Sequence, residues 1–246
     1  MNPEELPVTA NPGRRRVLGA LAGAAAAPLL GASTGAVAAG FPQKPVRLIV
    51  PFATGGATDI LGRLIGRGME STLGQSVIVE NRPGAAGGIG AALVAKSEPD
   101  GYTMLMAGVG SNTVLNLTQP ATPYDAERDL QSVIYVCDVD YVMVVNAASP
   151  YRTLADLIGA ARARPDTVSY MSTGQNGPLH VGMEYLARRA KVKMIHVPYK
   201  GEAPAFGDLI GGRIDVAVMT VPFTKPQIAA GKLRPIATIS AQRARG

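Results

Sequence analysis

Cysteine and histidine, which most metal and redox sites need, are scarce in this sequence. Its 246 residues include one cysteine, Cys137, and two histidines, His180 and His196. A single cysteine excludes an internal disulfide and any structural zinc or iron–sulfur site built from several cysteines. Cys137 follows the apolar run 133–136, so we expect a buried core thiol there. We expect no metal and no cofactor.

Tryptophan is absent, aromatic residues make up 5% of the chain, and the net charge is only +6. Few rings are therefore available to stack on bases, and the basic excess is small, so we expect no nucleic-acid partner. Hydrophobic residues reach 47%, which is typical of a globular protein. The length allows one large domain or two small ones.

The first 38 residues have the order of an export signal. Three arginines, 14–16, precede an Ala/Gly/Leu-rich stretch through Ala32, and Ala36-Val37-Ala38 forms an A-x-A cleavage site. The arginines indicate the twin-arginine route and a periplasmic product. An uncleaved membrane anchor is the alternative. No later stretch approaches the roughly 20 apolar residues that a span needs, so we expect no membrane insertion after cleavage.

Apolar runs and helical spacings alternate through the rest of the chain. Strands are predicted at 46–50, 76–80 and 102–106, with helices from Thr58 or Asp59 to Gly74 and from Ala91 to Ala95. A second set has strands at 142–145, 168–171, 194–197, 214–218 and 236–239, and helices at 154–163, 179–190, 204–210 and 225–230. This order is typical of parallel sheets flanked by helices.

We therefore predict an α/β protein of two lobes with a cleft between them. The first lobe takes residues 39–141, the second takes 142–234, and residues 235–246 return to the first. The sequence stops just after a predicted strand. The C-terminal part of the first lobe is therefore expected to be missing.

Three loops at predicted strand ends share an unusual composition. Residues 51–59, 107–113 and 172–180 are rich in glycine, hydroxyls and amides and contain no lysine or arginine. In open α/β sheets, ligands bind at the carboxyl ends of strands, where helix N-termini present free N–H groups. Such loops predict an anion site built from neutral donors. Taken singly, each composition is also that of an ordinary turn.

Enzyme motifs are absent: there is no G-x-S-x-G, H-E-x-x-H or G-x-x-x-x-G-K-[ST] sequence. The glycine-rich segment 84–90 follows a strand, but it is out of register with G-x-G-x-x-G and is preceded by Arg82-Pro83, which disfavours a dinucleotide site. His196, inside a predicted strand, is interpreted as structural. We expect no catalytic residues.

Several strings resemble the Bug family, the periplasmic substrate-binding proteins of tripartite tricarboxylate transporters. The resemblance runs from Phe41 to about Ser240 and rests on strings that recur in order at the family's spacing. They are KPVRLIVPF (44–52), GGATD (55–59), VENRPG (79–84), PDGYT (99–103), PYD (123–125), HVPYKG (196–201) and DLIGGRID (208–215).

The resemblance implies a two-lobed Venus flytrap fold that closes on a small carboxylate and delivers it to a membrane permease. We expect it to act as a monomer. Carried over by position, the resemblance places one wall of the ligand site at Phe52, Thr54, Gly55, Gly56, Thr58 and Asp59. The opposite wall would be Ser172, Thr173, Gln175, Asn176, Gly177 and His180, with Ser111 at the edge of the cleft.

One departure bears on the ligand. Relatives that bind amino acids tend to carry an acidic residue where this chain has Met219-Thr220, and methionine cannot pair with an ammonium group. We therefore expect a ligand without an amino group, such as an aliphatic dicarboxylate or an aromatic acid. Two alternatives stay open: an exported enzyme with His180 as base and Asp59 as its partner, or a sensor that presents its closed form to a signalling protein.

Overall fold

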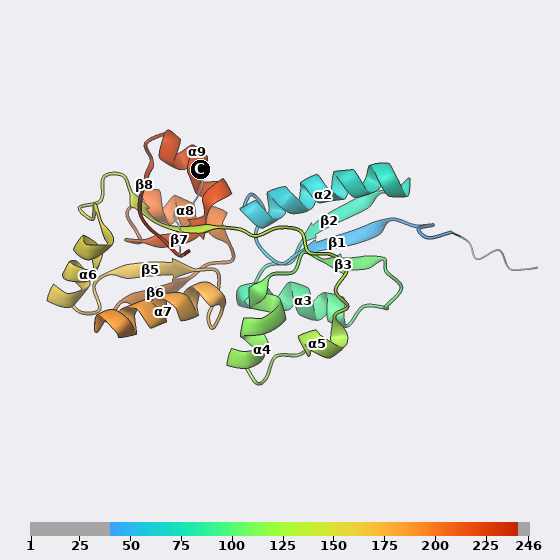
Figure 1. The fold of residues 1–246 in the computed structure, drawn as a ribbon, viewed down its shortest axis with the longest axis horizontal. Helices are drawn as coiled ribbons and strands as arrows, with labels where there is room; N and C mark the ends of the chain where they lie inside the picture. The colour runs from blue at the N-terminus through green and yellow to red at the C-terminus, as the bar shows by residue number, and fades with distance from the viewer. Residues whose placement is uncertain (1–39, 241–246) are drawn as a thin grey trace, which may run out of the picture. The chain divides into compact units, whose positions relative to one another are not determined.

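The computed structural model describes residues 40–240. The chain divides into two units, residues 1–43 and 44–246, and the helices and strands assigned within the described range lie in the second unit (Figure 1). The predicted export signal falls on residues 1–38, outside the described residues. Across 40–240, no helix combines the length and hydropathy that a membrane span requires.

The first lobe contains a parallel three-stranded sheet in the order β2-β1-β3. Its strands are β1 (Val46–Val50), β2 (Val77–Asn81) and β3 (Thr103–Leu105), connected by the helices α2 (Ala57–Leu73) and α3 (Gly88–Ala95). The predicted β-α-β-α-β order is therefore confirmed here. The loop after β1 leads into α2, so the carboxyl end of this central strand supplies the first candidate binding loop.

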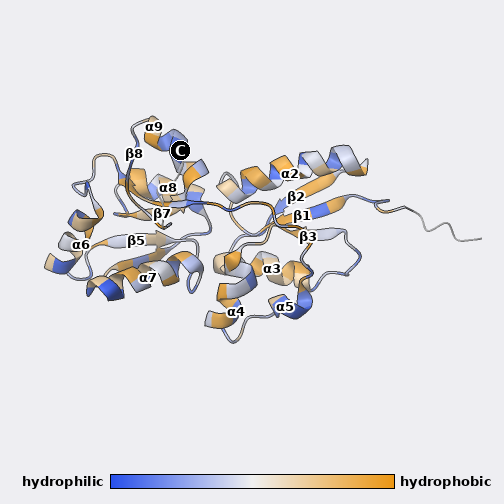
Figure 2. Ribbon diagram, viewed as in Figure 1, coloured by the Kyte–Doolittle hydropathy of each residue, from blue (hydrophilic) through white to orange (hydrophobic). Residues whose placement is uncertain are grey.

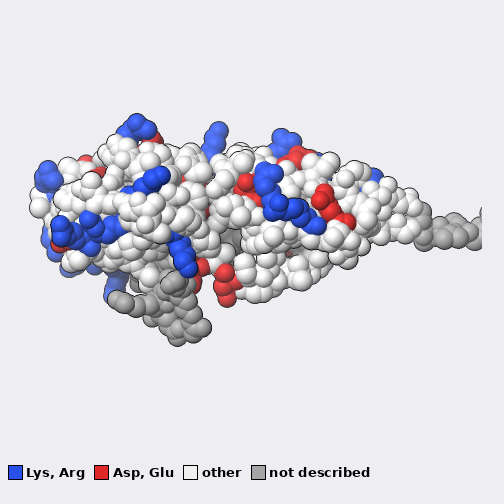
Figure 3. Space-filling model, turned by 90° about the horizontal axis from the view of Figure 1, so that it is seen from above, with Lys and Arg blue, Asp and Glu red and all other residues white. Residues whose placement is uncertain are grey.

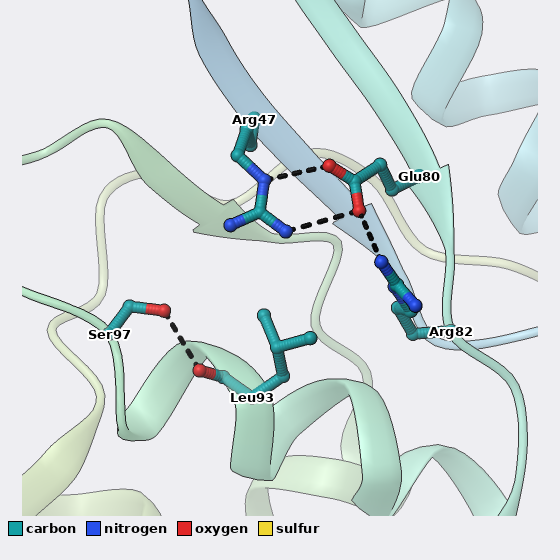
Figure 4. Close-up of polar contacts among 5 residues, drawn as sticks. All are labelled: Arg47, Glu80, Arg82, Leu93 and Ser97. Carbon is teal, nitrogen blue, oxygen red and sulfur yellow. Dashed lines mark hydrogen bonds and ion pairs between the residues drawn. The ribbon is translucent and has the colours of Figure 1, made fainter.

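Strand β1 contributes apolar side chains to a core and a charged side chain, Arg47, to an ion-pair cluster. Val46, Leu48 and Val50 pack in a core with Leu61 and Ile65 of α2, and Figure 2 shows β1 and β2 as largely hydrophobic. On the opposite face, Arg47 donates from Nε to Glu80 Oε1 at 2.7 Å and from Nη2 to Oε2 at 3.1 Å. Arg82 Nη2 donates to the same Oε2 at 2.9 Å. This ion-pair cluster lies near the end of α3, where Ser97 donates to the Leu93 carbonyl (Figure 4).

Sequence analysis missed two short segments of the first lobe. A π-helical turn at Gly110–Val114 continues into α4 (Leu115–Thr118), and α5 covers Ala126–Asp129. The start of α2 also differs, because its N-cap is Gly56 rather than Thr58 or Asp59. Asp59 lies in the first turn, and its carboxylate accepts the N–H of Gly55. Asp59, in the first turn of α2, therefore holds the preceding loop in place through Gly55.

The second lobe contains a three-stranded sheet in the order β7-β4-β8 and a parallel pair, β5-β6. The strands are β4 (Tyr141–Asn146), β5 (Ser169–Ser172), β6 (Ile195–Pro198), β7 (Ala217–Thr220) and β8 (Leu233–Thr238). A parallel bridge between Tyr170 and Val216 joins β5 to the segment before β7. The helices are α6 (Leu154–Ala163), α7 (Pro178–Ala190), α8 (Glu202–Ile210) and α9 (Val221–Ala229).

Two predictions about this lobe need correction. β4 pairs antiparallel with both β7 and β8, so this sheet is not mainly parallel. Residues 235–238 lie in β8 and stay in the second lobe instead of returning to the first. A strand such as β4, with Val142–Val145 buried, is apolar on both faces, and its composition carries no signal of direction.

Cys137 was also placed wrongly, because its side chain is exposed. The connecting segment 130–140 has no assigned helix or strand, and Val133, Ile134 and Tyr135 are 70–80% exposed. Apolar composition alone predicted a buried thiol here, but within the described residues no strand is assigned to this segment and no sheet covers it.

Candidate functional site

The loop after β1 is held in shape by Asp59, which is 3% exposed. Its Oδ2 accepts the N–H of Gly55 at 3.0 Å and Arg63 Nε at 3.2 Å, and its Oδ1 accepts Asn81 Nδ2 at 2.9 Å. Burial alone would raise the pKa of Asp59, but the hydrogen bonds from Arg63, Gly55 and Asn81 outweigh it and lower the pKa. Both oxygens of the ionised carboxylate therefore accept hydrogen bonds that hold the loop in place.

This loop presents backbone donors at the start of α2. Among the described residues, the N–H groups of Thr54, Gly56 and Thr58 have no hydrogen-bond partner within the chain. Thr54 is exposed, Thr58 is half-buried and Gly56 is buried. Helix N-termini carry a partial positive charge and unpaired N–H groups, which is the arrangement that binds carboxylates.

The second lobe contributes the loop between β5 and α7. Ser172 is fully buried, and its hydroxyl donates to the Gly174 carbonyl and accepts the Gly174 N–H, at 3.0 and 3.1 Å. Ser172 Oγ also lies 2.6 Å from His196 Nε2. With the hydroxyl proton directed at the Gly174 carbonyl, His196 donates from Nε2, which is the arrangement of its neutral Nε2–H tautomer. This network shapes the loop and gives His196 the structural role predicted for it.

Two stacked imidazoles support the same loop. The rings of His180 and His196 lie 4.0 Å apart between centroids, and His180 Nδ1 accepts the N–H of Asn176 at 3.1 Å. Burial and then the nearby His180 lower the pKa of His196 to about 4, against the opposing charge of Glu184. In the described part of the chain, the partners of His180 do not include Asp59. The acid–base pair of the enzyme alternative is therefore not assembled.

Loop 172–177 packs so closely against Ala86 of the first lobe that Gly174 and Gly177 have no room for a side chain. A Cβ added to Gly177 would lie 2.5 Å from Ala86 Cβ, and one added to Gly174 would lie 2.4 Å from Ala86 N. Thr118 Oγ1 donates to the Asn176 carbonyl at 3.0 Å, and Gln119 Nε2 donates to the Gln175 carbonyl at 3.3 Å. The two lobes thus meet across residues that are far apart in sequence.

A second contact between the lobes joins the β1 loop to the segment after β6. Ala53 N–H donates to the Lys200 carbonyl at 3.0 Å. Glu202, 8% exposed, accepts Ala57 N–H at 3.3 Å and Thr220 Oγ1 at 3.0 Å on Oε2, and the N–H of Thr220 on Oε1. Burial raises the pKa of Glu202, and these hydrogen bonds oppose the rise. A carboxylate of the second lobe therefore lies at the N-terminus of α2.

Sequence analysis missed Glu202 and the segment 85–87. The available signal was position: Lys200-Gly201-Glu202 follows β6, and 85–87 follows β2, each at the carboxyl end of a strand. The backbone of 85–87 is unusual as well, since Ala85, Ala86 and Gly87 all have positive φ. The glycine-rich segment dismissed as a weak dinucleotide motif thus forms part of the contact with loop 172–177.

Three of the predicted site residues are buried and bonded or packed within the protein. Met219 is fully buried in the core of the second lobe, together with Val142, Met171 and Leu209. Thr220 is buried and bonded to Glu202. Ser111 is 3% exposed, and its hydroxyl bonds to Gly108 and Asn112 within its own turn. Met219 and Thr220 were predicted from the resemblance, at a position following the strand expected at 214–218, whereas β7 covers Ala217–Thr220.

The remaining predicted residues lie on the two loops as follows. Phe52, Thr54, Gly55, Gly56, Thr58 and Asp59 belong to the β1 loop and the first turn of α2, while Ser172, Thr173, Gln175, Asn176, Gly177 and His180 belong to the β5 loop and the first turn of α7. Among these loops, the N–H groups of Thr173 and Gln175 are also without a partner in the described chain.

Two cavities and the surface charges lie outside the predicted loops. A cavity of ≈ 390 Å³ beside Arg47 and Tyr102 and one of ≈ 240 Å³ beside Ile89 and Leu115 both lie in the first lobe, and neither is lined by the predicted walls. Residues 40–240 contain no group of three or more His, Cys, Asp or Glu side chains able to hold a metal ion. On the face in Figure 3, the described Lys and Arg side chains are dispersed, with Asp and Glu between them.

Together, these features define a class of protein: a two-lobed α/β fold with backbone N–H groups on loops of both lobes that have no partner among the described residues. The chain belongs to the family whose model is described as "Tripartite tricarboxylate transporter family receptor" (TctC), which matches residues 61–245. This is a family of periplasmic solute-binding proteins rather than of enzymes, and the resemblance to the Bug proteins is confirmed.

Sequence and structure comparisons agree with this assignment. The chain is 38% identical over 243 residues to the "UPF0065 protein in tcbD-tcbE intergenic region" of Pseudomonas sp. strain P51, covering 99% of this chain and 71% of that protein. It spans 58–63% of several other curated relatives.

Two solved structures share the fold. "R. palustris Rpa4515 with adipate" is 36% identical with a TM-score of 0.78, covering 83% of this chain and 68% of that one. "Structure of periplasmic binding protein BugD" is 32% identical with a TM-score of 0.77, covering 82% and 68%. The two-lobed fold expected from the sequence is therefore confirmed.

Proposed function

We propose that this protein is an extracytoplasmic receptor that binds a small carboxylate without an amino group, an aliphatic dicarboxylate or an aromatic acid, and delivers it to the membrane permease of a tripartite tricarboxylate transporter. Export by the twin-arginine route and action as a monomer belong to the same proposal. The observation that carries it is the set of N–H groups on the β1 and β5 loops that have no partner among the described residues, on two loops that are each hydrogen-bonded to the opposite lobe.

The physical argument concerns desolvation. A carboxylate that leaves water loses several kcal/mol of hydration unless donors replace it. Hydrogen bonds to a charged group contribute about 1.5–3 kcal/mol each, and a helix N-terminus adds about 0.3–1 kcal/mol. Several N–H groups must therefore act together, and those of Thr54, Gly56 and Thr58, at and before the start of α2, have no partner among the described residues. The similar structure of Rpa4515 with adipate supports the same ligand class.

Lobe closure would couple binding to delivery. A ligand that bridges the β1 and β5 loops binds the closed arrangement better than the open one and shifts the population toward it. The enzyme alternative is weakened because Asp59 is committed to Gly55, Arg63 and Asn81. A sensor would use the same closed form, with a signalling partner in place of the permease.

The test is a thermal-shift screen of mono-, di- and tricarboxylates at pH 7, followed by calorimetry on each hit. A ligand at 100 times its Kd adds about 2.7 kcal/mol to stability, which raises Tm clearly. We expect shifts with aliphatic or aromatic acids, no shift with glutamate or aspartate, and no turnover of the bound acid. Preference for amino acids would overturn the ligand class, and turnover lost in His180→Ala would favour the enzyme.

A further inference from the structure

The two lobes carry opposite net charges. Residues 40–140 contain seven Lys or Arg and ten Asp or Glu, whereas residues 141–240 contain twelve Lys or Arg and six Asp or Glu. Half of the basic residues of the second lobe lie where α6 and α7 end. This basic face consists of six exposed side chains: Arg162, Arg164, Arg188, Arg189, Lys191 and Lys193.

Hydrogen bonds hold the two halves of the basic face together. Arg162 Nη2 donates to the Ala190 carbonyl at 3.0 Å, and the N–H of Asp166 donates to the Lys193 carbonyl at 3.3 Å. The ends of α6 and α7 therefore lie side by side (Figure 1), and Figure 2 shows both ends as hydrophilic. The six positive charges thus belong to one surface of the second lobe.

The requirements of folding do not account for this cluster. Among residues 40–240, none of the six side chains forms an ion pair. A single cation near the C-terminus of a helix is favourable, but several cations close together repel one another and oppose the compact state. The basic face is therefore suited to meet negative charge on another molecule.

Helix α7 adds two contact residues beside the basic face. Tyr185 is 64% exposed and Val181 is 42% exposed. They share a helix face with Arg188 and Arg189, because residues three or four positions apart in a helix are neighbours on its surface. Tyrosine and arginine are enriched at the centres of protein interfaces, and arginine matches both oxygens of a carboxylate. This combination fits an acidic protein surface.

Two acidic residues favour a protein over a membrane as the partner. Glu184 precedes Tyr185 on α7, and Asp166 lies between the ends of the two helices; both side chains are exposed. A uniformly anionic lipid surface repels both carboxylates, whereas a protein can place a basic group opposite each of them.

We propose that the basic face docks on an acidic periplasmic surface of the membrane permease of the tripartite tricarboxylate transporter. This inference rests on the proposed function and names the part of this protein that meets its partner. Helix α7 has 13 residues, so it extends about 20 Å from the β5 loop to the basic face. A permease bound at the end of α7 therefore leaves the β5 loop uncovered for release of the ligand.

The test measures uptake of the tightest acid of the carboxylate screen by cells in which a variant replaces the wild-type protein. The docking variant combines Arg164→Gln, Arg188→Gln and Arg189→Gln. It spares Arg162, because this guanidinium bonds the Ala190 carbonyl. Calorimetry on the purified variant gives its Kd for the same acid, which separates docking from ligand binding.

The matched control removes three exposed charges of the same lobe outside the basic face: Arg152→Gln, Lys225→Gln and Lys232→Gln. A photo-reactive amino acid in place of Tyr185 identifies what touches α7 in intact cells. Sedimentation with vesicles of equal parts phosphatidylglycerol and phosphatidylcholine measures membrane binding.

We expect the docking variant to lower uptake about tenfold or more, because the encounter with the permease loses its electrostatic attraction. Its Kd for the acid should stay within about twofold of the wild-type value, since the basic face lies at the far end of α7 from the β5 loop. The control should change neither quantity. The photo-reactive group should crosslink to the permease.

Two outcomes would overturn the inference and leave the proposed function standing. Wild-type uptake with the docking variant would show that the permease does not use the basic face. Vesicle binding that is lost in the docking variant, without a crosslink to the permease, would make the partner a membrane. A wild-type protein that binds the acid but supports no uptake would instead refute delivery to a permease, and the inference with it.

Discussion

Gly177 and Ala86 are in such close contact that the glycine has no room for a side chain: a Cβ there would lie 2.5 Å from Ala86 Cβ. Gly177 has φ −77°, so an alanine would be unstrained in its own backbone. The severe restriction comes from Ala86 of the first lobe, and the Gly174 carbonyl of the same loop, at 3.3 Å, adds a weaker one. The fit between the lobes at this point therefore depends on one methyl group and one hydrogen atom.

Gly177→Ala should weaken ligand binding at least tenfold, because the added methyl group keeps the β5 loop away from Ala86. The free energy of unfolding should fall by no more than about 1 kcal/mol, since Gly177 is an N-cap. Calorimetry with the tightest acid of the carboxylate screen measures the first quantity, and urea unfolding the second.

Ala86→Gly added to Gly177→Ala should restore the affinity, since it removes the clashing methyl group and Ala86 has φ 52°, where glycine is unstrained. Gly182→Ala is the control: it lies on α7 with nothing within 4 Å and should leave affinity unchanged while adding about 0.5–1 kcal/mol of stability. Unchanged affinity in Gly177→Ala would show that binding does not need this contact.

His196 should make the second lobe sensitive to acid. Burial and the neighbouring His180 lower its pKa to about 4 in the folded protein, against about 6.5 when unfolded. The folded state thus binds fewer protons between these values, so stability is complete above about pH 6.5 and falls as the pH drops toward 4. Partial solvent exposure limits the loss to about 1–2 kcal/mol. The other ionisable groups near His196 are Tyr170, whose ring stacks on it, and Glu184, which accepts the Tyr170 hydroxyl.

Urea unfolding of the wild-type protein and His196→Gln at pH 7 and pH 4.5 checks this prediction. His196→Gln should be less stable than the wild-type protein at pH 7, but its free energy of unfolding should fall by less between pH 7 and pH 4.5. An NMR titration of the His196 imidazole should give a midpoint near 4 and the Nε2–H tautomer. A midpoint near 6.5 would show that the ring is not held in its neutral form by the fold.

Glu80 should contribute to stability only while it is ionised. The hydrogen bonds from Arg47 and then Arg82 lower its pKa to about 2 (Figure 4). A carboxylate with a lowered pKa stabilises the fold above its unfolded pKa of about 4.5, and this contribution is lost as the pH falls toward 2. Glu80→Gln should therefore cost about 1 kcal/mol at pH 7, a modest value because the pair is partly exposed.

The difference between Glu80→Gln and the wild-type protein should shrink when urea unfolding is repeated at pH 3. Glu127→Gln, on the exposed helix α5, is the matched control and should change little at either pH. Equal stability of Glu80→Gln and the wild-type protein at pH 7 would show that the cluster contributes no net free energy.

Local patterns in the sequence predicted much of the fold. β1 and α2 followed from a β-branched run and from apolar residues at helical spacing, because burial on one side of an element repeats with its period. The candidate loops were proposed from glycine and hydroxyl residues at predicted strand ends, and the structure places them after β1 and β5. Direction was not predictable for β4, and neither was the exposure of Cys137, because an apolar run has the same composition whether or not another strand pairs with it.

The sequence by itself determined the alternation of elements, the family and the loops that carry the candidate site. Only the tertiary structure decided which residues of those loops meet. Glu202 lies 145 residues from Ala57 and 18 from Thr220, and Gly177 meets Ala86 across the two lobes. Hydrophobic period and turn composition describe a residue's own segment, whereas contacts between segments arise from the packing of the whole chain.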